Sequence, residues 1–134
     1  MANGRSSASI RNIGWKPLLA GAVLTFVLLL LAELVARAVG TAVVAIGLST
    51  AAFFLAGHLA ARFVPEARPI EPALGSGLVV LVLGLLQFSA PRAEAPATTT
   101  QIVLFTALVA VMAFVLAFLG ARLARTLQMR RSSF

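Results

Sequence analysis

The sequence contains no cysteine and no tyrosine, and it has only one histidine and one tryptophan. Without cysteine the chain cannot form a disulfide, a thiolate metal site or a thiol redox centre, and one histidine cannot supply several imidazole ligands. Acidic residues number only four and are distributed over three regions. No residues have the spacing of a Ser/His/Asp set or of paired catalytic carboxylates. We therefore predict that the protein is not an enzyme and carries no cofactor or metal.

Charged residues make up only 11% of the 134 residues, whereas hydrophobic residues make up 60%. The mean hydropathy of +1.02 is far from that of soluble globular proteins. The net charge of +7 would suggest a nucleic-acid partner for a soluble protein, but here the basic residues flank apolar runs, where membrane topology signals lie. We expect a lipid bilayer around the chain and no nucleic-acid binding.

Four long apolar runs predict four membrane-spanning helices, since crossing a bilayer takes about 20 mainly apolar residues. The expected fold is all-α, an integral membrane four-helix bundle of two antiparallel hairpins, forming a single domain over residues 1–134. The expected spans are residues 17–38, 42–64, 72–89 and 101–124, with basic tails at 1–16 and 125–134. The last helix is expected to end near Leu127.

Turn and cap signals separate the predicted helices. Gly40 and Thr41 are the only turn residues between the first two runs, so we expect a tight hairpin there. Pro72 suits the first turn of the third helix, and the threonines before Gln101 offer an N-cap for the fourth. The first run also has the length of a secretory signal core, with Ala36-Arg37-Ala38 as a cleavage-like site. Retention is favoured because the following segment is itself apolar, and cleavage is the alternative.

Orientation follows from the distribution of basic residues, because lysine and arginine resist translocation. Nine of them lie on one side of the four predicted spans: Arg5, Arg11, Lys16, Arg62, Arg68, Arg122, Arg125, Arg130 and Arg131. Only Arg37 and Arg92 lie on the other side. Both termini are therefore predicted to be cytoplasmic. Five residues are expected to anchor the helices at the membrane interface: Trp15, Lys16, Arg62, Arg122 and Arg125. The excess of arginine over lysine, with abundant alanine and leucine, is typical of a GC-rich bacterial genome and hence of an inner membrane.

Small residues indicate where the helices pack, because close backbone approach drives association in lipid. The predicted packing residues recur at intervals of about four on the second and fourth helices: Ala52, Ala56, Gly57, Ala60, Ala113, Ala117 and Gly120. The two helices also end alike, in Gly57-His-Leu-Ala-Ala-Arg62 and Gly120-Ala-Arg-Leu-Ala-Arg125. Duplication of a hairpin is one interpretation, and a shared helix-exit pattern is the other.

Ionisable residues within predicted spans are the candidates for function, because charge inside a bilayer is costly. Glu33 and His58 are too far apart along their helices to pair. Glu33 has Arg37 one turn further on, which predicts an ion pair near the outer interface. A proton- or cation-linked carboxylate is the alternative. His58 is expected at the inner interface above Arg62, with a proton sensor or ligand contact as the alternative.

Three features lie close together in the chain: the second-helix exit of Gly57, Ala61 and Arg62, the proline-containing link, and Gly75 and Gly77 at the start of the third helix. Together with the four spans, these features resemble the YrzE-like group of small bacterial membrane proteins. The resemblance covers mainly residues 50–90, and it implies a four-span membrane fold without a catalytic residue. We expect a structural or accessory role, with binding to a larger membrane protein or self-association. A small oligomeric transporter or channel with Glu33 in its pathway is the alternative.

Overall fold

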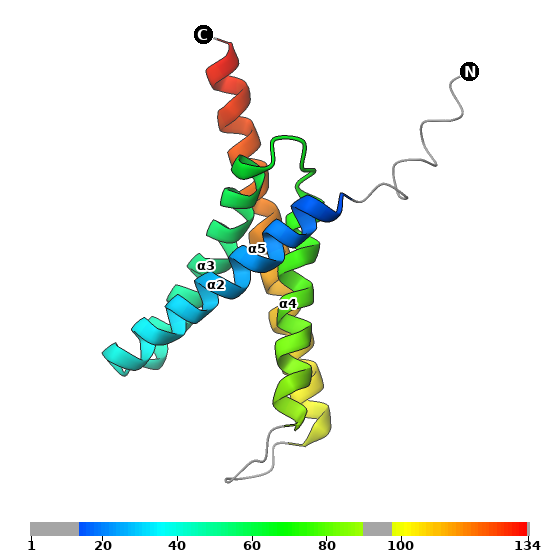
Figure 1. The fold of residues 1–134 in the computed structure, drawn as a ribbon. Coiled ribbons are helices and arrows are strands. Elements are labelled where there is room, and N and C mark those ends of the chain that lie inside the picture. Colours follow the sequence, from blue (N-terminus) through cyan, green and yellow to red (C-terminus); the bar gives the residue numbers. More distant parts are fainter. Residues whose placement is uncertain (1–13, 90–97, 134) are drawn as a thin grey trace, which may run out of the picture.

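The computed structural model describes residues 14–89 and 98–133, which form helices joined by short connections. Four helices follow one another: α2 (Trp15–Val39), α3 (Ala42–Phe63), α4 (Ile70–Ser89) and α5 (Thr99–Ser132) (Figure 1). The predicted all-helical class is confirmed. Arg5, Arg11 and Arg92, with the first 13 residues of the predicted N-terminal tail, lie outside the described residues.

Three of the helices, α2, α3 and α5, are long and apolar enough to cross a membrane. The apolar part described for α4, Ile70–Leu86, is shorter. At a rise of about 1.5 Å per residue, the full 20 residues of α4 extend for about 30 Å, the thickness of a hydrocarbon core. The 34 residues of α5 extend for about 51 Å, so this helix is longer than any one crossing requires.

The helix ends follow local sequence signals. Gly40 ends α2 in the left-handed region at φ 75°, which glycine adopts without a Cβ clash, and its N–H donates to the Ala36 carbonyl oxygen. Thr98 caps α5 by accepting from the Gln101 N–H, and the Gln101 side chain accepts in turn from the Thr98 N–H. The predicted threonine cap is therefore confirmed.

The carboxyl end of α5 extends further than predicted. The helix continues to Ser132, beyond the end expected near Leu127. Residues 125–132 contain neither glycine nor proline, and arginine, leucine, glutamine and methionine all favour helix, so nothing in this stretch breaks the chain. The last turns of α5 project beyond the other helices (Figure 1).

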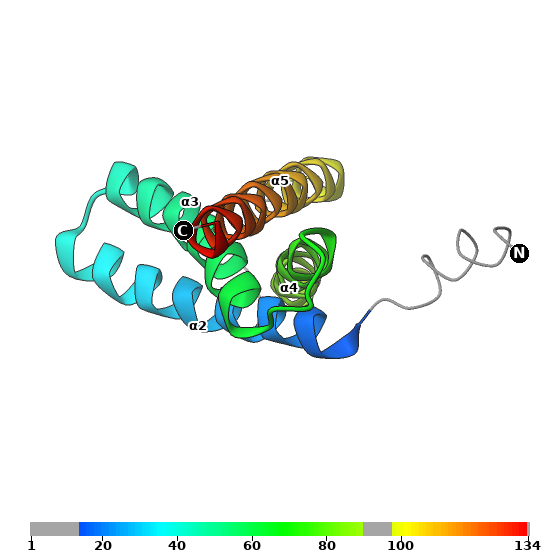
Figure 2. The same cartoon turned by 90° about the horizontal axis from the view of Figure 1, so that it is seen from above.

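The helices form two hairpins, α2 with α3 and α4 with α5, that pack across one another. Around the bundle, α2 packs on α3, α3 on α5, α5 on α4, and α4 on α2. Helix α3 also touches α4 across the middle. The hairpins are close together near the α3–α4 link and diverge away from it, so that α2 and α3 slope away from α4 and α5 (Figures 1 and 2). A small apolar core around Phe53, Val80, Ala110 and Ala113 lies between them.

The hairpins meet at two helix crossings built from small residues. Gly57 and Gly120 lie at the α3–α5 crossing, and Gly21 and Gly75 lie at the α2–α4 crossing. At each of these glycines, an added Cβ would overlap backbone atoms of the other helix. All the packing residues predicted from the sequence are buried: Ala52, Ala56, Gly57, Ala60, Ala113, Ala117 and Gly120. Dispersion between closely approaching backbones is what associates helices in lipid.

Candidate functional site

Glu33 and Arg37 form the ion pair that their spacing predicts. The Arg37 Nε donates to Glu33 Oε1 at 2.9 Å, and the side chains are 77% and 57% exposed for Arg37 and Glu33, respectively. The pair lies on the outer surface of α2, close to its turn with α3. Glu33 thus already has a counter-charge and does not face the core between the hairpins.

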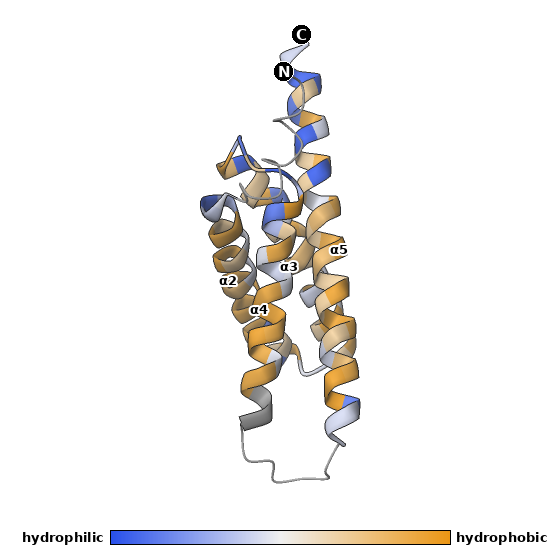
Figure 3. Ribbon diagram, turned by 90° about the vertical axis from the view of Figure 1, so that its right-hand side faces the viewer, coloured by the Kyte–Doolittle hydropathy of each residue, from blue (hydrophilic) through white to orange (hydrophobic). Residues whose placement is uncertain are grey.

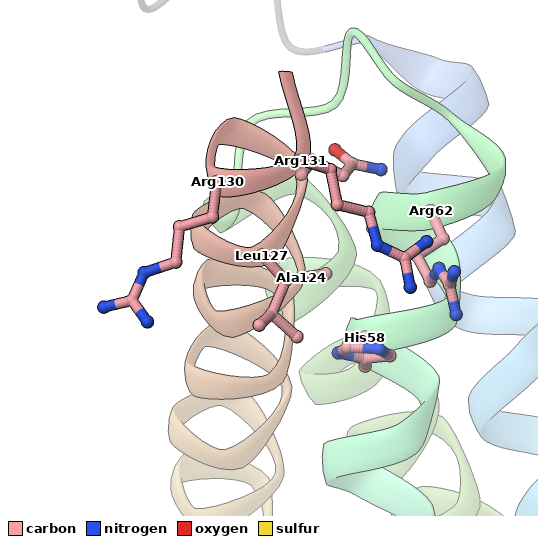
Figure 4. A pocket seen from close by; sticks show the side chains of 7 residues that line it. His58, Arg62, Ala124, Leu127, Arg130 and Arg131 are labelled. Carbon is pink, nitrogen blue, oxygen red and sulfur yellow. The ribbon is translucent and has the colours of Figure 1, made fainter. Parts of the chain in front are cut away.

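His58 lies in the α3–α5 interface, where its Nδ1 is 3.3 Å from the Gly120 carbonyl oxygen. A carbonyl oxygen only accepts, so Nδ1 is the protonated nitrogen in this hydrogen bond. The histidine is half-buried and forms one wall of a cavity of about 260 Å³ between the carboxyl ends of α3 and α5. Arg62 lies one turn beyond it, and Arg130 and Arg131 contribute from α5 (Figure 4).

Glu71 is a buried carboxylate that we did not single out from the sequence. It is only 4% exposed, and it joins three segments of the chain. Oε1 accepts from the Gly14 N–H at 3.0 Å, just before α2, and Oε2 accepts from the Arg68 N–H at 2.9 Å, in the α3–α4 link. Its place in the first turn of α4 also suits the positive end of the helix dipole. In the sequence, only this position in the first turn indicated that Glu71 has a structural role.

Thr25 and Ser76 form a second polar contact that sequence reasoning missed. Their hydroxyl oxygens are 2.6 Å apart, both residues are fully buried, and they join α2 to α4. Thr25 is the only hydroxyl residue in the apolar stretch of α2, and a lone polar residue there could have indicated a hydrogen bond to another helix. One hydroxyl donates to the other, so that each buried oxygen has a hydrogen-bond partner and the contact fastens α2 to α4.

An apolar groove lies where α3 and α5 diverge. Its volume is about 420 Å³, and it lies on the opposite side of the Gly57–Gly120 crossing from the His58 cavity. Its walls include these residues from the amino-terminal halves of the two helices: Ala45, Ile46, Ser49, Phe105, Leu108 and Met112. Ile46, Phe105 and Leu108 are each more than 60% exposed. The groove is therefore open to the surroundings of the molecule.

The predicted anchors lie at the surface near one end of the helices. Trp15 is 75% exposed, Lys16, Arg62 and Arg122 are exposed, and Arg125 is half-buried. Hydrophilic residues gather at this end, on the last turns of α5 and in the α3–α4 link, while apolar residues dominate the middle of the helices (Figure 3). Hydrophilic residues at one end and apolar residues in the middle are typical of helices that have one end at the interface between membrane and water.

The ionisable side chains of the described residues are dispersed over the fold. Within residues 14–89 and 98–133, no three side chains among His, Cys, Asp and Glu gather where a metal ion could bind. The side chains of Glu33, His58 and Glu71 each interact with a different group, in three separate places. Two spaces of contrasting chemistry lie along α3 and α5, a basic cavity at one end and an apolar groove further along.

Comparison with known proteins finds no matching family model, no similar curated protein and no similar solved structure.

Proposed function

We propose that this protein crosses a bacterial inner membrane four times, with both ends of the described chain on the cytoplasmic side. Within the described residues, seven of the eight lysine and arginine residues lie toward the end that carries the α3–α4 link: Lys16, Arg62, Arg68, Arg122, Arg125, Arg130 and Arg131. Arg37 lies at the other end of α2. The asymmetry supports this orientation because basic residues resist translocation.

We further propose that the protein is an accessory subunit that binds an apolar transmembrane helix of a larger membrane protein. The apolar groove between α3 and α5 is the observation that carries this proposal. The groove is open, and its lining contains no ionisable side chain. The two helices that bound it are already packed against each other at the Gly57–Gly120 crossing. A third helix can therefore enter without the hairpins having to rearrange.

The chemistry of the groove suits a helix better than a lipid chain. Ala45 and Ser49 lie one turn apart on its α3 wall, which is the small-residue spacing that lets a second helix approach closely. Met112, on the α5 wall, is flexible enough to adapt to a partner surface. The helix exit of Gly57, Ala61 and Arg62 resembles that of the YrzE-like small membrane proteins, and we propose membership of that group.

The position of Glu33 gives no support to the transport alternative. A carboxylate that couples transport to protons or cations needs access to a polar path through the protein. Glu33 is instead on the outer surface of α2 and is paired with Arg37. The groove, by contrast, contains no ionisable side chain. The accessory role is therefore the function that the described residues favour.

Photo-crosslinking in the native membrane tests this proposal. A photoreactive residue is placed at Ile46 or Leu108 in the groove, and at Val23 on α2 or Leu85 on α4 as controls of similar exposure. We expect one protein adduct of defined mass from both groove positions and only lipid adducts from the controls. Ser49→Leu, which places a larger side chain in the groove, should remove the protein adduct.

Two results would overturn the accessory role. Adducts only with lipid from the groove positions would make the groove a lipid-facing surface. An adduct only with a second copy of this chain would replace the accessory role with self-association, and would bring the transport alternative forward.

A further inference from the structure

The cavity beside His58 is distinct from the apolar groove in both place and chemistry. It lies between the carboxyl ends of α3 and α5, and its volume of about 260 Å³ is slightly below the ~300–1,000 Å³ of typical small-molecule pockets. Figure 4 shows the Arg62 and Arg131 side chains converging above His58, whereas Arg130 points away. A small, strongly charged group fits such a space better than a large cofactor.

The charge of the cavity favours an anion. Its lining contains three arginines and the histidine but no carboxylate. Arg62 and Arg131 bring two positive charges together, and the carboxyl ends of α3 and α5 offset only about one charge in total through the helix dipoles. A pair of guanidinium groups that is only partly compensated is stabilised by an anion placed between them. Guanidinium also presents paired N–H donors that match phosphate oxygens.

The other walls of the cavity define the ligand further. His58 donates through Nδ1 to the Gly120 carbonyl oxygen, so in the neutral ring Nε2 can accept a hydrogen bond from a ligand but cannot donate one. Ala124 and Leu127 supply an apolar wall on α5, in the direction of the membrane-spanning part of the helix. A ligand with a charged head and an apolar body would therefore match both parts of the cavity.

We propose that this cavity binds the phosphate group of an anionic phospholipid from the membrane leaflet at this end of the helices. Arg62 and Arg131 hold the phosphate oxygens, and the apolar wall directs the glycerol and acyl chains toward the bilayer. Basic pockets between transmembrane helices on the cytoplasmic side are suited to such headgroups. The site is independent of the partner role, because headgroup binding and helix binding use opposite sides of the α3–α5 crossing.

Thermal unfolding of the purified full chain in micelles tests the site. Phosphatidylglycerol is titrated into a neutral detergent, and phosphatidylcholine at the same mole fraction is the lipid control. We expect a saturable rise in Tm with phosphatidylglycerol only. Arg62→Gln and Arg131→Gln should each weaken the apparent affinity roughly tenfold, as expected for loss of one charge-assisted contact.

Arg122→Gln is the matched control variant, because it removes the same charge from an exposed position on the same helix, outside the lining of the cavity. It should change the apparent affinity by less than about twofold, as expected for an exposed charge without a contact to the ligand. Equal losses in Arg122→Gln and Arg131→Gln would reduce the effect to general surface charge and would overturn the site. No response of the wild-type protein to phosphatidylglycerol would overturn it as well.

Inorganic phosphate in the lipid-free detergent distinguishes the two sources of a phosphate group. We expect no Tm shift at millimolar phosphate, because the apolar wall contributes only to lipid binding. A shift with inorganic phosphate that matches the shift with phosphatidylglycerol, and that Arg131→Gln removes, would assign the cavity to a free anion and overturn the lipid assignment.

Discussion

Gly57 and Gly120 are related reciprocally across the α3–α5 crossing. A Cβ on Gly57 would overlap the carbonyl oxygen of Ala117, three residues before Gly120, and a Cβ on Gly120 would overlap the carbonyl oxygen of Phe54, three residues before Gly57. The two contacts are equivalent, as expected if a local twofold axis relates α3 and α5, which run in the same direction. At this crossing the two helices therefore face each other with backbone, and neither glycine leaves room for a side chain.

The α2–α4 crossing has the same reciprocal register. A Cβ on Gly21 would overlap Pro72, three residues before Gly75, and a Cβ on Gly75 would overlap the Leu18 carbonyl oxygen, three residues before Gly21. Each helix of the first hairpin therefore crosses its counterpart in the second. This correspondence favours the interpretation that the similar exits at Gly57 and Gly120 reflect a duplicated hairpin.

Substitution of a crossing glycine should destabilise the protein. In Gly57→Ala the added methyl group requires α3 and α5 to separate, which costs about 1–3 kcal/mol of unfolding free energy, the usual range for overpacking. Gly47→Ala is the control on the same helix, since no atom lies within 4 Å of its Cβ position. That control should gain about 0.5–1 kcal/mol from helix propensity. Unfolding of the detergent-solubilised protein in SDS measures both, and equal effects would refute the close crossing.

Glu71 should be more important for stability than its place at the start of α4 suggests. Glu71→Gln replaces one carboxylate oxygen by an amide nitrogen, so that one of the two backbone N–H donors, of Gly14 or Arg68, loses its acceptor. We expect a loss of about 1–3 kcal/mol in unfolding free energy. The exposed Glu66 in the preceding α3–α4 link is the matched control, and Glu66→Gln should stay within about 0.5 kcal/mol of wild type. Equal stability of the two variants would show that the Glu71 contacts contribute nothing.

Thr25 and Ser76 should be energetically coupled. Thr25→Val or Ser76→Ala leaves the other hydroxyl buried without its partner, whereas the double variant removes both groups. A double-mutant cycle of unfolding free energies should give a coupling of about 0.6 kcal/mol, with an upper limit of about 1.7 kcal/mol, as measured for hydrogen bonds between membrane helices. Additive effects would mean that the two hydroxyls do not act as a pair.

Glu33→Gln should be tolerated. The exposed pair with Arg37 contributes at most about 1 kcal/mol, so the variant should insert and fold as the wild type does. Proton flux into liposomes should be equal for wild type, Glu33→Gln and protein-free vesicles. A flux that the wild-type protein supports and Glu33→Gln abolishes would instead establish the transport alternative.

Features set by neighbouring residues in the chain were predictable from the sequence. The long apolar runs indicated the helices, Gly40 the turn, Thr98 and Gln101 the cap, and the four-residue spacing of Glu33 and Arg37 their ion pair. Small-residue spacing also indicated buried positions, because lipid-embedded helices depend on close approach.

Features set by distant segments were not predictable in this way. Glu71 is buried because Gly14, 57 residues earlier, reaches it, and no local pattern encodes that contact. Likewise, the divergence of the hairpins and the two spaces beside the α3–α5 crossing depend on which glycines face each other. A sequence shows the spacing of small residues but not the register between helices.

Gentle extraction from the native membrane, followed by mass determination, shows directly whether the protein works as a subunit bound through the α3–α5 groove. We predict recovery in a stoichiometric complex with one larger membrane protein, and loss of that complex in Ser49→Leu without loss of the folded chain. Recovery of the wild-type protein alone, or only as a homo-oligomer, would contradict the account.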